Sequence, residues 1–222
     1  MTAHDVARLL PDTPVLRDVC RSMAVLEAVL SPEWSSRHHS FDAGWSPGEE
    51  MASMQNGSGD EYSIVFSAAG AYIRGFDHEA VMSPYGNDGP WPGVLDSVPE
   101  VFRHCVAEPA FCDEDGMPVV TACLWRESGD YRWRVGEIDY PEGAGDPDGA
   151  TRLFGRLVDP SAKAFQRFAE DYYEVSVDLD AVRHVYALRP LTQAVVTALN
   201  ADLAMTDLAV DLRAARYPSA AG

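Results

Sequence analysis

The residues of this chain best suited to chemistry are Asp77-His78-Glu79, which follow an apolar segment. On a loop, one imidazole and two carboxylates can converge on a metal ion, with His78 as its nitrogen ligand, or act as acid and base. Adjacent residues of a strand point to opposite sides, so this convergence requires that the strand ends before Asp77. The same groups can instead satisfy backbone donors around an irregular loop, which is a structural role. The sequence leaves both interpretations open.

A stiff aromatic loop continues the same stretch of chain. Tyr85 and Trp91 stand among prolines at positions 84, 90 and 92. Aromatic side chains anchor many interfaces, so the loop could line a ligand pocket or a partner surface. The alternative is that Trp91 fills a gap against the sheet. Together with Arg74 on the preceding strand, Tyr85 and Trp91 form the candidate binding set.

Other signatures of catalysis are absent from the sequence. There is no phosphate-binding loop, dinucleotide fingerprint, nucleophile elbow or His-Glu-x-x-His motif, and we expect no cofactor. The four cysteines form no Cys-x-x-Cys pair, which excludes a zinc ribbon or a thioredoxin-type centre. Cys20 and Cys123 fall on apolar faces and are expected in the core.

An antiparallel meander is expected to hold the 77–79 loop. Residues 49–55 lead to the strong turn dipeptide Asn56-Gly57, and apolar residues alternate over 62–66. A second short turn leads into 71–76. These connections are too short for the crossovers that parallel strands need.

Three further segments bring the expected sheet to about six strands. Residues 117–125 are apolar on both faces, which is typical of a central strand. Over 131–135, Tyr131 and Trp133 alternate with arginines, which predicts one solvated face. A weaker candidate covers 38–41.

Helices are expected before, between and after the predicted strands along the chain. Residues 14–30 start at Pro14 and stop before Pro32, and 98–106 carry a second apolar stripe. A turn-rich acidic linker, 139–149, precedes a helical set. That set comprises 151–158, a helix capped by Asp159-Pro160, a helix capped by Asp178, a helix after Pro190, and a short last helix from Thr206 to Arg216.

The expected fold is therefore α+β, with an antiparallel sheet of about six strands packed on one side by helices. We expect a single domain over 1–222. Its β-rich part covers about 34–138, and a C-terminal helical subdomain of about 150–217 docks through apolar stripes that need a partner.

Several blocks of the sequence resemble a family of uncharacterised stand-alone bacterial proteins of unknown function. These blocks are Glu49-Glu-Met-Ala-Ser-Met-Gln-Asn-Gly-Ser-Gly-Asp60, Gly75-Phe-Asp-His-Glu79, Met82-Ser-Pro-Tyr85, Trp91-Pro-Gly-Val-Leu95, Glu108-Pro-Ala-Phe111 and Leu124-Trp-Arg126. The resemblance extends through the C-terminal helices. It implies a bacterial cytosolic protein, and it brings no activity or catalytic residue with it.

The charge of the chain restricts its partners. Of its 222 residues, 35 are acidic and 17 basic, which gives a formal net charge of -18. Such a charge argues against binding to nucleic acid or to an anionic membrane and allows a basic protein partner. Neither a signal peptide nor a membrane span is recognisable, so we expect a cytoplasmic protein with reduced thiols. The candidate acids are Glu137, Asp139, Glu142, Asp146, Asp148, Glu170, Asp171 and Glu174.

Two functions of different class follow. The first is a non-enzymatic binding protein of regulatory or immunity type, which the absence of catalytic motifs favours. The second is a metal-assisted hydrolase that uses Asp77, His78 and Glu79, which the clustering of these three residues favours. The sequence alone does not decide whether the protein is an enzyme.

Overall fold

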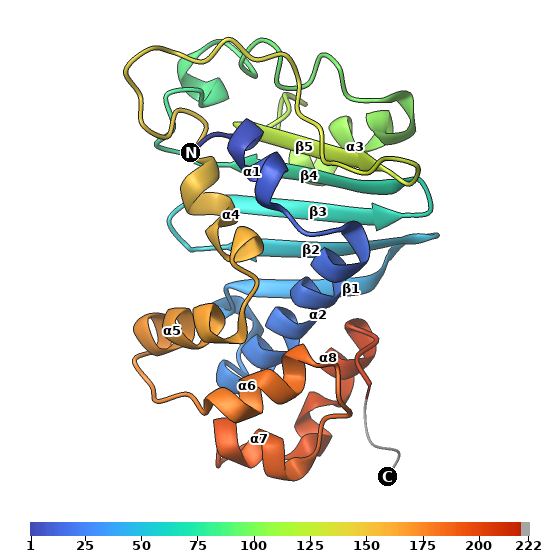
Figure 1. Cartoon of the computed structure of the whole chain (residues 1–222), viewed down its shortest axis with the longest axis vertical. Coiled ribbons are helices and arrows are strands. Elements are labelled where there is room, and N and C mark those ends of the chain that lie inside the picture. Colours follow the sequence, from blue (N-terminus) through green and yellow to red (C-terminus); the bar gives the residue numbers. More distant parts are fainter. Residues whose placement is uncertain (219–222) are drawn as a thin grey trace. The chain divides into compact units, whose positions relative to one another are not determined.

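The structure is a computed structural model that describes residues 1–218 (Figure 1). It confirms the α+β class, since one antiparallel sheet with the strand order β1-β2-β3-β4-β5 is combined with helices. The strands are β1 (His39–Ser46), β2 (Glu49–Gln55), β3 (Glu61–Ser67), β4 (Gly70–Phe76) and β5 (Ala122–Glu127).

Helices precede, interrupt and follow the strands along the chain. The α-helices are α1 (Ala3–Leu9), α2 (Thr13–Leu30), α3 (Arg103–Val106), α4 (Ala150–Val158), α5 (Ala162–Tyr173), α6 (Leu179–Tyr186), α7 (Gln193–Leu199) and α8 (Ala209–Ala214). The 3-10 turns are Trp34–Ser36, Pro84–Gly86, Glu100–Phe102, Pro109–Phe111 and Met205–Leu208. None of the helices within 1–218 is long and apolar enough to cross a membrane.

The sheet has five strands, not about six, because residues 131–135 form no strand. Only one bridge joins this segment to β5, between Trp125 and Arg134. The indole of Trp133 turns inward and donates a hydrogen bond of 2.8 Å to the carbonyl of Pro11. The apolar run 117–125 also becomes a strand only from Ala122 onward.

Three expected helices differ in detail. The last, expected from Thr206 to Arg216, is the 3-10 turn Met205–Leu208 followed by α8. Residues 98–106 form a 3-10 turn followed by the short helix α3, with Val98, Phe102 and Cys105 buried and Val101 exposed. Ser161, rather than Asp159-Pro160, caps α5 by accepting a hydrogen bond from the backbone of Ala164. Asp178 caps α6 as expected.

The chain divides into two compact units, and each unit is discontinuous in sequence. Unit 1 comprises 1–13 and 53–158, and unit 2 comprises 14–52 together with the residues from 159 onward. The acidic segment 139–149, which the sequence suggests as a linker, therefore lies inside unit 1.

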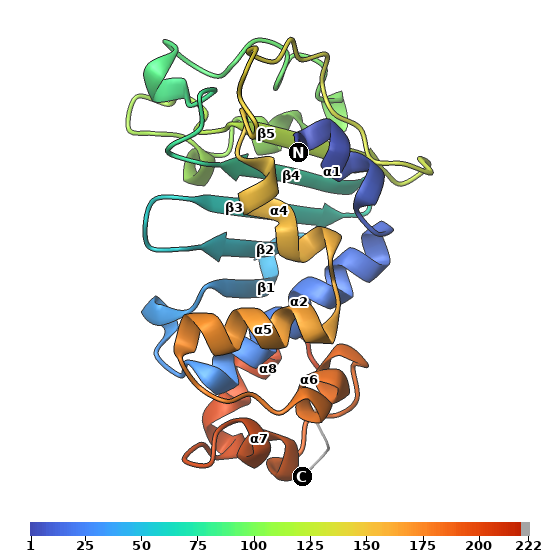
Figure 2. The ribbon, with the colours of Figure 1, turned by 60° about the vertical axis from the view of Figure 1, so that its left-hand side comes forward.

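In unit 1, helices α1 and α4 cover one face of β4 and β5 (Figure 2). The closest approach is at Gly75, where an added Cβ would lie 2.6 Å from the ring of Phe154 on α4. Tyr62 of β3 lies opposite Gly75 and packs on the same phenylalanine, with ring centroids 5.9 Å apart. A glycine at position 75 thus lets α4 sit directly on the sheet.

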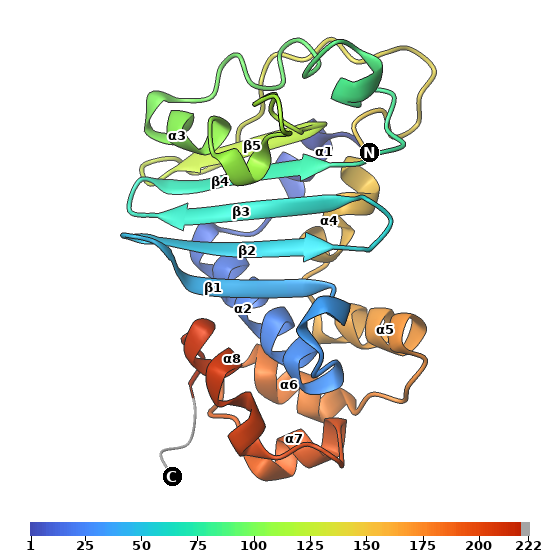
Figure 3. The ribbon, with the colours of Figure 1, turned by 180° about the vertical axis from the view of Figure 1, so that it is seen from behind.

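The other face of β4 is covered by the segment around α3, which is seen from behind in Figure 3. Because side chains alternate along a strand, Tyr72 and Arg74 point to this side. The ring of Tyr72 lies 6.2 Å from that of Phe102, and the guanidinium of Arg74 lies 5.3 Å from the ring centroid of Phe111. Strand β4 is therefore buried on both faces, and every one of its residues is buried.

Unit 2 is organised around α2, whose residues from Val19 to Val29 are nearly all buried. Within it, the carboxylate of Glu27 is fully buried and compensated. It lies 2.7 Å from Nδ1 of His39 and accepts hydrogen bonds from the backbone of His38 and the hydroxyl of Tyr173. This network ties α2 to β1 and α5, and buried charges need such partners.

Candidate functional site

The register of β3 and β4 brings two carboxylates together. Glu61 at the start of β3 pairs with Phe76 at the end of β4. Asp60 and Asp77 are the next residues outward on these antiparallel strands, so they face each other where the ladder ends. Their side chains are only 2% and 3% exposed. Two buried like charges destabilise a fold unless a cation lies beside them.

His78 compensates Asp60. Its Nδ1 lies 2.7 Å from Oδ1 of Asp60, and its backbone N–H donates to the same oxygen at 3.1 Å. The hydrogen bond to Asp60 raises the pKa of His78 above 6.5. Burial alone would raise the pKa of Asp60, but the hydrogen bonds from His78 outweigh it and hold the pKa below 3.8.

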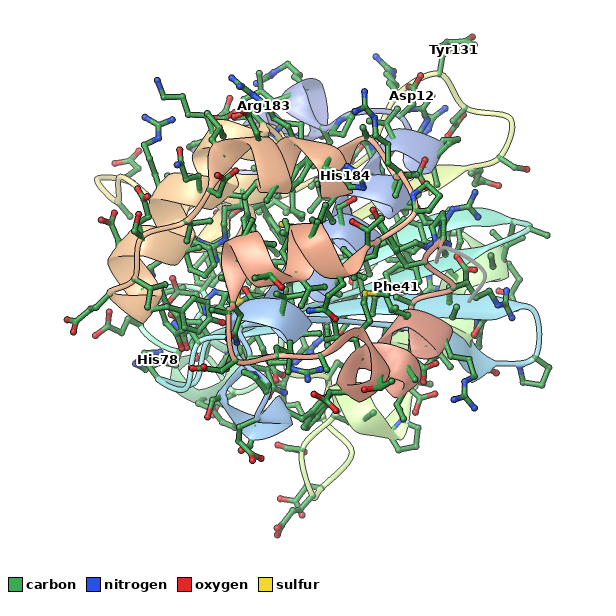
Figure 4. The ribbon with its side chains drawn as sticks, turned by 90° about the horizontal axis from the view of Figure 1, so that it is seen from below. Asp12, Phe41, His78, Tyr131, Arg183 and His184 are labelled. Carbon is green, nitrogen blue, oxygen red and sulfur yellow. The ribbon has the colours of Figure 1, made fainter. Side chains whose placement is uncertain are left out.

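The imidazole of His78 is also open to solvent. Its side chain is 40% exposed and points outward in Figure 4. Among the described residues, Nε2 has no hydrogen-bond partner. A buried carboxylate that holds Nδ1 leaves Nε2 accessible to a proton or to a hydrogen-bonding ligand.

Arg152 of α4 compensates the remaining acids. Its Nη2 lies 2.7 and 2.8 Å from the two carboxylate oxygens of Asp77, and its Nη1 lies 3.0 Å from Glu79. Its Nε is 3.7 Å from Asp60. Hydrogen bonds to Asp77 and Glu79 raise the pKa of Arg152. We call Asp60, Asp77, His78, Glu79 and Arg152 the Arg152 cluster.

The backbone around Asp77 is shaped to accommodate this cluster. Gly149 has φ +70°, and a Cβ there would lie 2.3 Å from the Cβ of Asp77. The amide of Asp77 donates to the hydroxyl of Thr121 at 3.2 Å. A residue larger than glycine at position 149 would displace Asp77.

The structure therefore brings the predicted triplet together, with two partners that the sequence did not reveal. Asp60 could have been noticed from the Asn56-Gly-Ser-Gly-Asp60 turn, because Asn56 bonds to Asp60 across it. Arg152 lies 75 residues after Asp77 in sequence, and no residue pattern around it indicates that the two side chains pair. In this arrangement the cluster ties the ends of β3 and β4 to α4.

The three candidate binding residues occupy different environments. Arg74 is buried, where it pairs with Glu61 and donates to the carbonyl of Val119 at 2.8 Å. This placement offers no surface to a ligand. Tyr85 is 63% exposed. Trp91 is half-buried, and its Nε1 donates to the carbonyl of Asp139 at 3.0 Å.

The aromatic loop and the acidic segment lie side by side (Figure 1). The amide of Met82 donates to the carbonyl of Pro147 at 3.1 Å, and Trp91 bonds to Asp139. Gly93, with φ +88°, lies so close to the backbone of Glu137 that a Cβ would be 2.1 Å from its carbonyl oxygen. We call five exposed residues in and beside these two segments, Tyr85, Asp88, Glu137, Asp139 and Glu142, the acidic–aromatic surface.

One candidate acid does not belong to any surface. Asp148 is fully buried, and its carboxylate accepts hydrogen bonds from the backbone of Ala3 at 2.8 Å and of Ala150 at 3.1 Å. It thereby caps the start of α4 and holds α1. Burial raises the pKa of Asp148.

A groove of about 860 Å³ in unit 1 is a further feature that the sequence did not indicate. Tyr131 lies on its rim, is 92% exposed and projects from its loop in Figure 4. Three of the lining arginines are already paired, Arg8 with Asp5, Arg126 with Asp12 and Arg134 with Asp130. The groove combines aromatic surface with charges that largely compensate each other.

Comparison of the chain with protein-family models, with curated proteins and with solved structures finds no match in any of the three.

Proposed function

We propose that this chain is a non-enzymatic binding protein of regulatory or immunity type, whose partner is a basic protein. The observation that carries the proposal is the acidic–aromatic surface, where the aromatic loop and the acidic segment are held together. An aromatic anchor gives affinity, and a surrounding acidic surface selects and steers a basic partner.

The loop that carries this surface is held firmly in place. Met82 and Val94 are completely buried, and Pro84 is buried as well. Tyr85 packs edge-on against Phe76 with ring centroids 5.8 Å apart. A loop fixed in this way loses little conformational entropy when it binds.

The distribution of charge supports a basic partner. Unit 1 contains 20 of the 35 acids but only 8 of the 17 bases. Such a one-signed field speeds encounter with an oppositely charged protein, such as a nuclease or another nucleic-acid-binding protein. The Arg152 cluster also fits this function, because Arg152 and His78 engage its carboxylates within the chain.

Capture of a partner at two salt concentrations tests the proposal. The immobilised full chain is compared with the variant D88N/D139N/E142Q, and the captured proteins are identified by mass spectrometry. The comparison variant is D171N/E174Q, which neutralises two candidate acids that are exposed in unit 2 and are not part of the acidic–aromatic surface. We expect a basic partner whose association rate falls roughly tenfold in the first variant and at high salt, and hardly changes in the comparison variant.

Truncation of Tyr85 tests the aromatic part separately. We expect Y85A to weaken binding of the captured partner by about 2 kcal/mol, as at an interface hot spot, through faster dissociation. The salt dependence of the association rate should stay the same. Capture of an acidic partner, or equal capture by the wild type and by D88N/D139N/E142Q, would contradict the proposal.

A further inference from the structure

The Arg152 cluster has an imbalance of charge. A single guanidinium faces three carboxylates, those of Asp60, Asp77 and Glu79, at 3.7, 2.7 and 3.0 Å. His78 adds at most one further positive charge. Two of the carboxylates are buried, so the excess negative charge is poorly screened by water and favours a cation of higher charge.

The donor atoms of the cluster are suited to a metal ion. Asp60, Asp77 and His78 each offer one ligand atom, and these three atoms lie within 4.8 Å of one another. Two carboxylates and an imidazole are typical ligands of first-row divalent metals such as Zn²⁺ and Mn²⁺. A small inward movement of the side chains would bring all three to about 2.0–2.2 Å from one ion.

The positions of the ligands are set by the fold. The register of β3 and β4 places Asp60 opposite Asp77, and glycine at position 149 leaves the space that Asp77 occupies. Gly59 lies against the ring of His78, where a Cβ would be 3.6 Å away. The three donors therefore converge independently of the flexible side chain of Arg152.

Arg152 is the member of the cluster that can leave it. Its side chain is 48% exposed, whereas its neighbours Leu153, Phe154 and Leu157 anchor α4 in the core. The guanidinium can swing into solvent without moving the helix, because arginine carries its charge on a long flexible stem.

We propose that Asp60, Asp77 and His78 form a binding site for a divalent transition-metal ion of the Zn²⁺ or Mn²⁺ class, and that Arg152 is a tethered cation which the ion displaces. The binding function proposed above requires no metal, so the two proposals stand independently. The site would supply the ion needed by the metal-assisted hydrolysis considered from the sequence, and hydrolysis would additionally need a substrate site.

Calorimetric titration of the metal-free full chain with ZnCl₂ and with MnCl₂ tests this assignment. We expect one ion per chain in the wild type and no binding in D77N. R152M keeps all three ligands and removes the competing cation, so it should bind about tenfold more tightly than the wild type. R132M removes another exposed arginine of unit 1 and should bind as the wild type does.

Paramagnetic broadening by Mn²⁺ locates the ion without relying on a variant that must fold. The ring resonances of His78 should broaden at substoichiometric Mn²⁺. H78Q, which keeps both carboxylates, should weaken Zn²⁺ binding by about tenfold or more. Absence of binding to the wild type, or equal affinities of R152M and the wild type, would show that Arg152 is a permanent clamp and would overturn the proposal.

Discussion

The contact between Asp60 and His78 couples a buried carboxylate to an exposed imidazole. In the folded protein the imidazolium is stabilised by Asp60, which accepts from both Nδ1 and the backbone of His78. An unfolded chain lacks this pair, so the two groups change their proton affinity on folding. Stability must therefore depend on pH through each of them.

We predict that His78 titrates above 6.5 in the folded protein, because its hydrogen bond to Asp60 favours the protonated ring. For a raised pKa, the stabilisation is fully present below the unfolded value near 6.5 and is lost as the pH rises through the folded value. Asp60 acts in the opposite sense, since its pKa is lowered and its contribution disappears as the pH falls below 3.8. The measurement is an NMR titration of the His78 ring.

D60N is the informative variant for this titration. It should bring the pKa of His78 back toward 6.5. A His78 that titrates at or below 6.5 in the wild type, or one that does not respond to D60N, would refute the coupling.

Residue types alone were enough to select Asp77-His78-Glu79, because few loops of the sequence combine these groups. They were not enough to identify Asp60 and Arg152, since strand register and helix docking bring those residues in. The role of Asp148 could not be predicted from residue types either. In the sequence it belongs to an acidic run, and in the fold it is a buried cap.

At the scale of elements, unit 1 depends on how closely α4 approaches β4. Gly75 provides that approach on the strand, and Gly149 provides it at the start of the helix. Arg152 can reach Asp77 only because α4 lies directly on the sheet. The packing of one helix thus decides whether the Arg152 cluster forms.

We predict that G75A destabilises the protein by about 1–3 kcal/mol, because the added methyl group would overlap the ring of Phe154 and push α4 outward. Gly155 on α4 provides a matched control, since an added Cβ there meets nothing within 4 Å. G155A should stabilise the helix by about 0.5–1 kcal/mol. Both values come from urea unfolding, and a G75A variant as stable as the wild type would disprove the close contact.

Most elements could be predicted because their apolar periodicity is strong, as in α2 and in the meander from β2 to β4. The segment 131–135 also alternates, yet a single bridge joins it to β5, and the indole of Trp133 donates to the carbonyl of Pro11. Helix α1 was not predicted, because it is short and is buried through contacts with Asp148 and α4. Tertiary contacts outweigh local pattern in both cases.

At the scale of the whole chain, each compact unit is assembled from two separate stretches. The sequence suggested a helical subdomain that begins near 150, whereas helix α4 belongs to unit 1 and helix α2 to unit 2. The sequence does not indicate that α4 and α2 belong to these units, because residue patterns predict whether a segment is a helix or a strand and not what it packs against.

We predict that residues 1–158 alone do not form a stable monomer. They contain α2 but lack the contacts it makes in unit 2, including the hydrogen bonds from Ser22 to Val185 and from Asn200 to Val29. Glu27 would also lose Tyr173. Size-exclusion chromatography and dye binding should show an aggregated or loosely packed species, with the full chain as the control. A monomeric fragment with a cooperative thermal transition would contradict the prediction.

The interleaving of the two units also governs what happens while the chain is being made. Helix α2 is made before its partners Tyr173, Val185 and Asn200, which follow only after residue 159. At about 5–20 residues per second, the delay is on the order of ten seconds. Throughout that time an apolar helix with Glu27 in its last turn lacks these partners and is exposed to chaperones and to neighbouring nascent chains. Residues made after position 159 therefore decide whether the earlier helix α2 is packed.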